Sequence, residues 1–150
     1  MKQVIMKAIS VFLIFFMSDS VYASEIKTLR CIFDKGGFSA QWDLDGKFKS
    51  EEAEFSSNEL ETVGIFDQID FQNNKARFIG NLGAVDVLIL PSHEIITFFH
   101  ILGRGNRIFT SVFINSPSKD GSFPFVMSRH LDMVMSPTVS QYYGTCIKLF

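Results

Sequence analysis

Three residues that could act together in catalysis alternate along one short segment. Ser128, His130 and Asp132 occupy every second position, and alternate residues of an extended strand point to one face, about 7 Å apart. Serine, histidine and a carboxylate are the groups of a hydrolytic triad. The serine lacks the glycine-rich turn that exposes a nucleophile beside oxyanion donors. A hydrogen-bonded polar stripe is therefore the preferred interpretation, a hydrolase is an alternative, and we assign no catalytic residue.

Two further patterns fall short of a metal site. The histidines His93, His100 and His130 share no strand or helix spacing that would bring two of them together, and no carboxylate cluster accompanies them. The segment Asp43–Gly46 begins like a calcium loop, but Phe48 stands where that loop needs glycine for its sharp turn. We expect no metal and no cofactor.

The residues best suited to recognition lie near the C-terminus. Arg129 is flanked at alternate positions by Met127 and Leu131, and a guanidinium among apolar groups needs a carboxylate or carbonyl partner. Adjacent tyrosines on a strand point to opposite faces, so one of the pair is expected to be exposed, where it offers contact area with a polar handle. The candidate contacts for a ligand or partner are Arg129, His130, Gln141, Tyr142 and Tyr143. For the tyrosine segment the preferred interpretation is a latch that carries the disulfide into the sheet, and recognition is the alternative.

We expect these residues to lie on β-strands, because apolar residues recur mainly at every second position of the sequence. Short runs of Val, Ile, Phe and Thr are separated by Gly, Asn, Asp and Pro, as in a sandwich or barrel. The expected strands are Lys27–Phe33, Phe38–Trp42, Leu60–Phe71, Lys75–Gly80, Ala84–Leu90, Ile95–Leu102, Arg107–Ile114, Phe123–Met135 and Gln141–Leu149. The two strands over 95–102 and 107–114 are apolar on both faces, which predicts that both faces are covered. The acidic residues 50–61 are expected to form a loop or a single helical turn, and Asn73-Asn74 a tight turn.

Phenylalanine is the unusual component of the composition. The chain has 17 phenylalanines, and 14 of them follow residue 23. In a β domain they either fill the interior or line a cavity within it. We expect an all-β fold, a single antiparallel β-barrel of lipocalin-like size or a β-sandwich, with the barrel preferred.

The two cysteines, Cys31 and Cys146, allow only one intramolecular pairing. An oxidising compartment favours a disulfide over two free thiols. The bond would join the terminal strands and stabilise the fold by about 4–5 kcal/mol through chain entropy. A redox or metal role would need a CxxC spacing or clustered ligands, and neither is present.

Residues 1–23 have the three parts of a bacterial Sec-type signal peptide. Lys2 and Lys7 supply the cationic region, Ala8–Met17 the apolar region, and Val21–Ala23 the cleavage motif, which predicts a cut before Ser24. The apolar run is about half of the roughly 20 residues that a membrane span needs. We therefore expect a cleaved signal over 1–23, a single β domain over 24–150, and a periplasmic or secreted location without membrane association after cleavage.

The charge balance excludes some partners. The chain has 14 Lys and Arg against 16 Asp and Glu, a net charge of −2, so it has no excess of cations to displace counterions from nucleic acid. Its mean hydropathy of +0.19 owes much to the signal, in which 16 of 23 residues are apolar.

The C-terminal Phe150 raises the alternative of a small outer-membrane barrel, in which the last strand would alternate apolar residues ending on that phenylalanine. The residues at that parity are Lys148, Cys146 and Gly144, whereas Leu149 and Ile147 have the other parity. This mismatch argues against membrane insertion.

Several segments carry a resemblance to known proteins. The residues Lys75–Ala84, Phe123-Pro124, Ser128–His130 and Ser140–Cys146 resemble uncharacterised small exported bacterial β-rich proteins, which implies a shared exported fold and no particular reaction. The chain is loosely similar to lipocalins in size, strand content and disulfide, although Gly37 and Trp42 do not form their Gly-x-Trp signature. The opening Thr28–Cys31 is similar to that of bacterial inhibitors of animal-type lysozyme, whose Ser-Gly-x-x-Tyr pattern is absent.

Taken together, these patterns predict a non-catalytic binding protein. Its ligand would be an apolar small molecule inside the barrel, or its partner a protein. The alternatives are a hydrolase that uses Ser128, His130 and Asp132, and the outer-membrane barrel.

Overall fold

A computed structural model describes residues 25–42, 47–54, 63–81, 83–131 and 137–149. Regular structure in these ranges consists of strands and one 3-10 turn, η2, over Gly103–Gly105. Within the described ranges, no helix is both long enough and apolar enough to cross a membrane. The expected signal over 1–23 lies outside the described residues.

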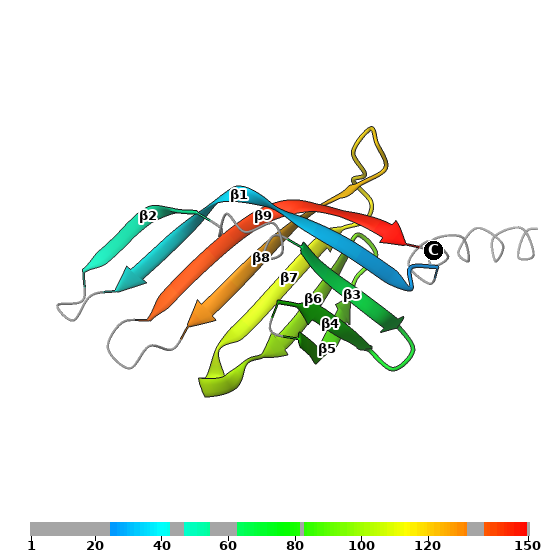
Figure 1. Ribbon diagram of the computed structural model, residues 1–150, viewed down its shortest axis with the longest axis horizontal. Coiled ribbons are helices and arrows are strands. Elements are labelled where there is room, and N and C mark those ends of the chain that lie inside the picture. The colour runs from blue at the N-terminus through cyan, green and yellow to red at the C-terminus, as the bar shows by residue number, and fades with distance from the viewer. Residues whose placement is uncertain (1–24, 43–46, 55–62, 82, 132–136, 150) are drawn as a thin grey trace, which may run out of the picture.

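Nine strands form one antiparallel sheet (Figure 1). They are β1 (Thr28–Trp42), β2 (Phe48–Glu54), β3 (Val63–Asp70), β4 (Lys75–Gly80), β5 (Gly83–Pro91), β6 (Ile95–Ile101), β7 (Arg107–Phe113), β8 (Phe123–Leu131) and β9 (Thr138–Leu149). Their order is β2-β1-β3-β4-β5-β6-β7-β8-β9, and β1 also pairs with β9. This pairing closes eight strands into a barrel and leaves β2 outside the ring. The all-β barrel expected from the alternation is confirmed.

The ring closes fully at only one end. Residues 29–32 of β1 pair with β3, but residues 36–42 pair with β2 instead. In the same way, β5 pairs with β6 only through Leu88–Pro91, and residues 83–87 of β5 pair with β4 alone. The strands β1, β8 and β9, together with β2 and the adjoining ends of β6 and β7, therefore continue beyond the closed section as a curved sheet (Figure 1). We refer to the inner face of this continuation as the trough.

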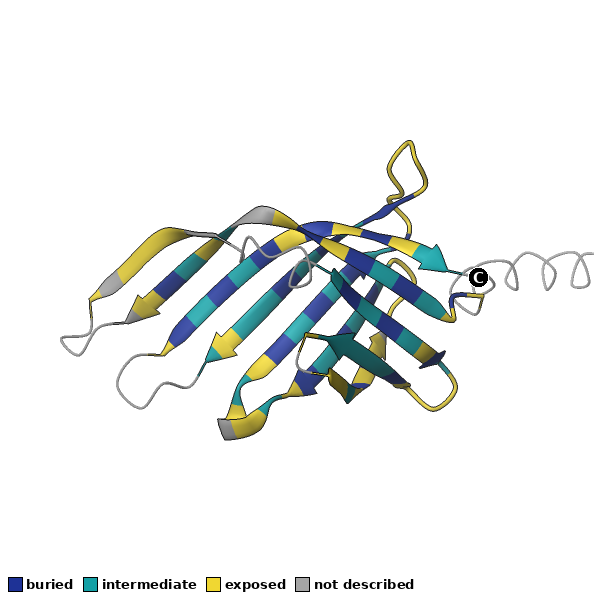
Figure 2. Cartoon of the chain, in the orientation of Figure 1, coloured by how far each residue is buried: buried dark blue, intermediate teal, exposed yellow. Residues whose placement is uncertain are grey.

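Burial alternates along the strands, as Figure 2 shows. In β9 the residues Thr138, Ser140, Tyr142, Gly144 and Cys146 are buried and face inward, while the residues between them are half-buried or exposed. Because the inward set is buried and the outward set is not, the wall is one layer thick in the described part of the chain.

The expectation that two strands would be covered on both faces was wrong. Along β6 the inward Ile96 and Phe98 are buried, whereas Thr97 and Phe99 are half-buried and Ile101 is 61% exposed. Along β7 the outward Phe109, Ser111 and Phe113 are likewise half-buried. These outward side chains are shielded mainly by their cross-strand neighbours, and that contact is enough to favour apolar residues on both faces of a strand.

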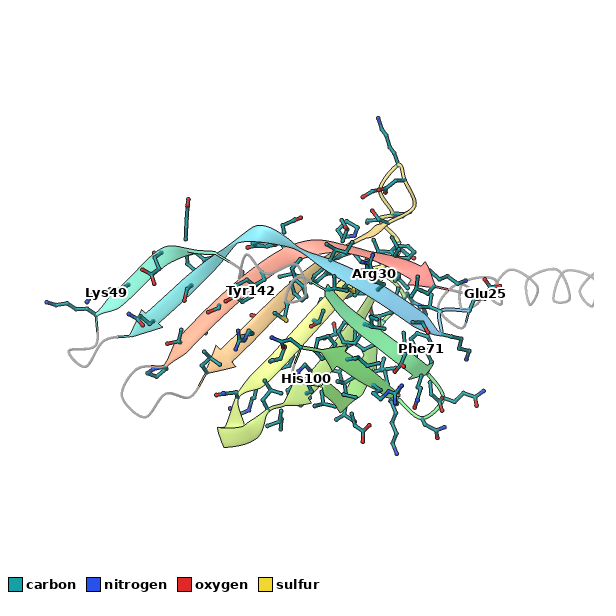
Figure 3. All side chains as sticks on the ribbon, viewed as in Figure 1. Glu25, Arg30, Lys49, Phe71, His100 and Tyr142 are labelled. Carbon is teal, nitrogen blue, oxygen red and sulfur yellow. A yellow bond between two sulfur atoms is a disulfide. The ribbon has the colours of Figure 1, made fainter. Side chains whose placement is uncertain are left out.

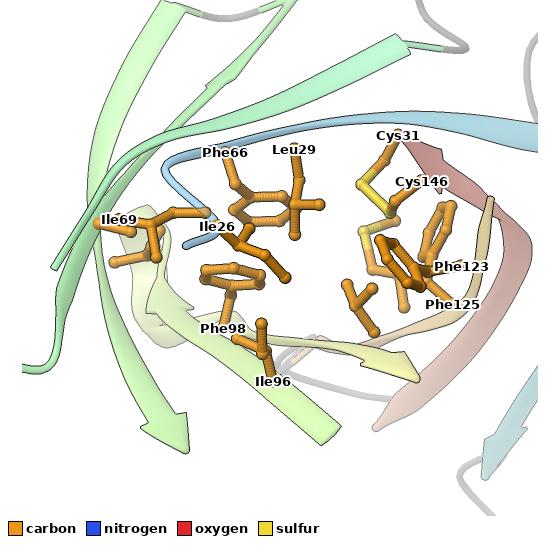
Figure 4. Packing of buried hydrophobic residues seen from close by; sticks show 14 of the residues in the cluster. Ile26, Leu29, Cys31, Phe66, Ile69, Ile96, Phe98, Phe123, Phe125 and Cys146 are labelled. Atoms are coloured by element: carbon orange, nitrogen blue, oxygen red, sulfur yellow. A yellow bond between two sulfur atoms is a disulfide. The ribbon is translucent and has the colours of Figure 1, made fainter. Parts of the chain in front are cut away.

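Aromatic side chains fill the closed end (Figure 4). Phe66 and Phe98 stack with ring centroids 4.0 Å apart, and Phe78 packs against Phe66 at 4.9 Å. Phe33 and Phe125 meet edge to face at 4.9 Å. Full burial of each such ring contributes about 1.5–3 kcal/mol. In the closed section the phenylalanines therefore form a packed core.

The expected disulfide is confirmed. Cys31 and Cys146 are bonded across a sequence separation of 115 residues, and they are directly opposite each other in the pairing of β1 with β9. The bond therefore joins the two strands whose pairing closes the barrel. Both cysteines are buried among the residues of the core (Figure 4).

Three expectations about strand boundaries were wrong. The expected strands 27–33 and 38–42 are one strand, β1, which continues through a shift of register between Phe33 and Gly37. Residues 50–54, expected in a loop, belong to β2 because the chain turns back and pairs with β1. Periodicity within residues 50–61 could not reveal this pairing, since the partner strand supplies it. Residues 55–61 and the segment Asp43–Gly46 lie outside the described residues. The last strand, β9, begins at Thr138, not at 141.

The tight turn at Asn73-Asn74 is confirmed. Asn74 has a φ of 54°, a left-handed conformation that asparagine tolerates well. The carboxylate of Asp70 accepts hydrogen bonds from the backbone N–H groups of Gln72 and Asn73, at 3.0 and 3.1 Å. Local chemistry is sufficient to define this connection between β3 and β4.

Candidate functional site

The five candidate contact residues divide between the two faces of the barrel wall. Arg129 and Tyr142 face inward, whereas His130, Gln141 and Tyr143 face outward. The division follows from strand geometry, because successive residues of β8 and of β9 alternate between faces. The structure therefore does not bring these five side chains together in one site.

The inward residues belong to a row that crosses the trough. His100 lies opposite Ile108, Ile108 opposite Arg129, Arg129 opposite Ser140, and Ser140 opposite Ser39. Directly opposite residues of antiparallel strands share a face, so these five, which we name the trough row, all point inward. Neighbouring strands lie about 4.8 Å apart, which places the backbones of His100 and Arg129 about 10 Å apart.

Two nitrogens of the trough row are buried without a partner. The Nε of Arg129 and the Nδ1 of His100 have no hydrogen-bond partner among the described residues. Nearly all buried polar groups in folded proteins are paired, because an unpaired one forfeits its hydrogen bonds to water. Two such atoms on one row mark the trough as the place where a molecule from outside the chain can complete the structure.

His100 is the buried histidine at one end of this row, and Figure 3 labels it on β6. It is only 5% exposed and stacks against Phe78 with ring centroids 5.5 Å apart. Burial lowers the pKa of its imidazole below the usual 6.5 because desolvation disfavours the charged form. The side chain is therefore neutral at pH 7, and its Nδ1 can act as a donor or as an acceptor.

A pocket of about 450 Å³ opens beside His100. It lies where the pairing of β5 with β6 ends, so the wall of the barrel is interrupted there. Val87, Leu88, Phe99 and Ile101 give the pocket an apolar wall, and Lys75, Arg77 and Asp86 supply charged groups around it. A pocket of this size and mixed lining suits a small molecule with an apolar body.

An ion pair stands on the outer wall next to this pocket. The Nε and Nη2 of Arg77 donate to the two carboxylate oxygens of Asp67 at 2.9 and 2.6 Å. The hydrogen bonds from Arg77 hold the pKa of Asp67 below its usual value. A charged pair on the outer face would be costly against lipid, which argues against the outer-membrane alternative.

The residues of the hydrolase alternative lie on the outer face of β8. The Oγ of Ser128 is 3.4 Å from the Nε2 of His130, which is exposed and touches the edge of Phe109. Asp132 lies outside the described residues. The contact between serine and histidine therefore belongs to the convex wall and points away from the trough.

The same outer wall carries the other candidate contacts for a partner. The hydroxyl of Tyr143 donates to the Oε1 of Gln141 at 3.4 Å. On β5 and β6, three to four strands away in the sheet, Leu88 and Leu90 are each 51% exposed and Ile101 is 61% exposed. The alternative of a protein partner would rest on this surface.

No three His, Cys, Asp or Glu side chains gather as a metal site in the described ranges. His100 is the site residue that sequence reasoning did not select. The sequence does contain an indication of its role. His100 continues the inward set Ile96 and Phe98, and a titratable group at the end of a buried apolar face is unusual.

Comparisons with protein families, with curated proteins and with solved structures found no match to this chain.

Proposed function

We propose that this chain is a non-catalytic, exported binding protein that holds a small apolar molecule at the open end of its barrel. The observation that carries the proposal is the pair of buried, unpartnered nitrogens, Arg129 Nε and His100 Nδ1, on one inward row. A ligand in the trough would supply the hydrogen-bond partners that the chain lacks.

The size of the ligand is limited by the packing of the closed end. Phe66, Phe98 and Phe125 are each at most 2% exposed and fill that section. The pocket beside His100 offers room of about 450 Å³, and its wall is largely apolar. We therefore expect one small molecule with an apolar body, and neither a cofactor nor a nucleic acid.

The position of Ser128 and His130 supports a binding role over hydrolysis. A catalytic serine and its base need a site that excludes water and donates to the oxyanion. His130 is exposed on the convex wall, on the face opposite the trough. A substrate held in the trough would not reach it.

Native mass spectrometry of the protein isolated from exporting cells tests the location and the binding together. We expect a chain that begins at Ser24, two hydrogens lighter than the reduced form, with a non-covalently bound small mass. Titration with the neutral apolar fluorophore N-phenyl-1-naphthylamine then measures binding directly. A chain with an intact N-terminus would contradict export, and the absence of fluorophore binding would contradict the binding function.

Two matched variants locate the site. Ile101 and Leu90 are both outward, apolar and more than half exposed, but only Ile101 lines the pocket. Ile101→Arg is expected to weaken binding of the fluorophore about tenfold, because an apolar molecule bound in the pocket would cover the introduced charge and remove it from water. Leu90→Arg is expected to leave binding unchanged. Equal effects of the two variants would contradict the location.

A further inference from the structure

We infer that the ligand of the trough is an amphiphile with a carboxylate head group, and that Arg129 binds this carboxylate. The inference rests on the binding function proposed above and adds the chemical class of the ligand. Among the described members of the trough row, Arg129 carries the one positive charge, because His100 is neutral and the other members are Ile108, Ser140 and Ser39.

Among the described residues, no acidic side chain forms an ion pair with Arg129. The guanidinium is ionised at all pH values of interest, and its neighbours at alternate positions on β8 are Met127 and Leu131. Its Nε is buried without a hydrogen bond, and the ion pairs of the described residues do not include it. Arg129 is half-buried, and a partly desolvated guanidinium whose Nε–H lacks a hydrogen bond is unfavourable, so an anion from outside the chain would complete this site.

The geometry of the unpaired Nε–H donor of Arg129 favours a carboxylate as its acceptor. The Nε–H and one Nη–H of a guanidinium are parallel donors, which match the two oxygens of a carboxylate in a bidentate pair. Ser140 lies directly opposite Arg129 on β9, and its Oγ is 3.2 Å from the Oγ of Ser39. Those hydroxyls place further polar groups beside the head-group position.

The rest of the row favours a ligand with an apolar tail. Ile108 lies between Arg129 and His100, and the apolar pocket begins at His100. The two ends of this path are about 10 Å apart, two strand spacings. Ile108 is only 5% exposed, so an alkyl chain between the two ends would have to turn the Ile108 side chain aside. Its carboxylate would then lie at Arg129 and its tail in the pocket.

Displacement of N-phenyl-1-naphthylamine from the disulfide-bonded protein tests the inference with three probes of equal chain length. The probes are decanoate, decanol and decyltrimethylammonium. We expect decanoate to bind at least tenfold more tightly than the other two. Arg129→Met should weaken the binding of decanoate at least tenfold and leave the binding of decanol unchanged. Arg129→Lys should retain part of the affinity for decanoate, because lysine keeps the positive charge but lacks the paired N–H donors of a guanidinium. Arg107→Met is the matched control, since Arg107 is exposed on the outer face of β7.

A second measurement separates a ligand contact from a structural one. Without ligand, Arg129→Met should unfold at a higher temperature than the parent protein, because it removes a half-buried charge whose Nε–H has no hydrogen bond, and Arg107→Met should not. Equal binding of decanoate and decanol, full decanoate binding by Arg129→Met, or a lower unfolding temperature for that variant would each overturn the inference. Loss of fluorophore binding by the parent protein would instead overturn the proposed function itself.

Discussion

Gly144 lies where β9 passes closest to β1. A Cβ built on this residue would meet the carbonyl oxygen of Ile32 and would lie 2.6 Å from Cε1 of Phe125. The contact with backbone cannot be relieved by turning a side chain. Just beyond it, the pairing of β1 with β9 shifts register between Phe33 and Gly37. The absence of a side chain at Gly144 therefore allows the close approach that precedes the bend of β1.

Gly144→Ala is expected to destabilise the protein by about 1–3 kcal/mol, the usual cost of forcing an extra methyl group into a packed site. Urea unfolding monitored by tryptophan fluorescence measures the change. Gly103→Ala is the control, because a Cβ at Gly103 has open space around it and the residue has no positive φ. Similar stabilities for the two variants would contradict the close packing at Gly144.

His100 makes stability depend on pH in a defined direction. Burial lowers the pKa of the folded imidazole below the unfolded value of about 6.5, so the unfolded state binds the proton more readily. The free energy of unfolding is expected to be level above about pH 6.5 and to fall below it, until the folded pKa is reached, with a slope of at most about 1.4 kcal/mol per pH unit.

The measurement is urea unfolding of the parent protein and of His100→Leu from about pH 8 to about pH 5. The variant should lose the dependence that His100 contributes, even if its absolute stability differs. The carboxyl groups of Asp67, Asp70 and Asp120 have lowered pKa values, so their contributions are lost only at lower pH and do not overlap this window. The same slope in both proteins would show that His100 is not the group responsible.

Among the elements, β1 and β2 determine the shape of the open end. β1 pairs with β3 over its first part and with β2 over its last part, so the sheet acquires an extra strand where the ring opens. β2 pairs with β1 alone, and Lys49, Ser50, Glu51 and Glu52 are all exposed. Acidic residues on a strand at the edge of a sheet discourage pairing with other chains. β2 therefore extends the sheet beyond the ring, and the side chains of residues 49–52 lie outside the core.

Hydrogen exchange should separate these elements. The amides of β2 are expected to exchange much faster than the alternate hydrogen-bonded amides of β9, because β2 has one partner strand and few buried apolar contacts. β9 has a partner on each side, β1 and β8. Native-state exchange read by mass spectrometry of peptic fragments measures the difference. Equal protection of the two strands would mean that β2 belongs to the cooperative core.

At the scale of the whole molecule, one covalent bond joins the two strands at which the ring closes, β1 and β9. The disulfide links the first and last strands of the ring across 115 residues of sequence. In the chain-entropy description, a loop of this length is worth about 4–5 kcal/mol of stability. The neighbouring core residues pack around both cysteines, so the bond and the packing support the same closure.

Cys31→Ala combined with Cys146→Ala is expected to lower the free energy of unfolding by about 4–5 kcal/mol. Urea titrations of the oxidised protein, the reduced protein and the double variant measure this loss. Reduced parent protein and double variant should agree within the cost of the lost sulfur atoms. A loss below about 1 kcal/mol would mean that the unfolded chain is already compact and gains little freedom from reduction.

The sequence by itself determined those features that depend on neighbouring residues. Alternating apolar positions identified most strands, the polar chemistry of Asp70 and Asn74 defined a turn, and the presence of only two cysteines left one possible disulfide. Each of these depends on local periodicity, local hydrogen bonds or simple counting. None requires knowledge of which strands are neighbours in the sheet.

Only the tertiary structure decided which candidate residues meet. Arg129 and His130 are adjacent in sequence but face opposite sides of the wall, while Arg129 and His100 are far apart in sequence and share the trough row. Strand register and ring closure set these relations, and both depend on contacts between distant parts of the chain. For the same physical reason residues 50–54 become a strand, since their pairing with β1 outweighs a local pattern that favours a loop.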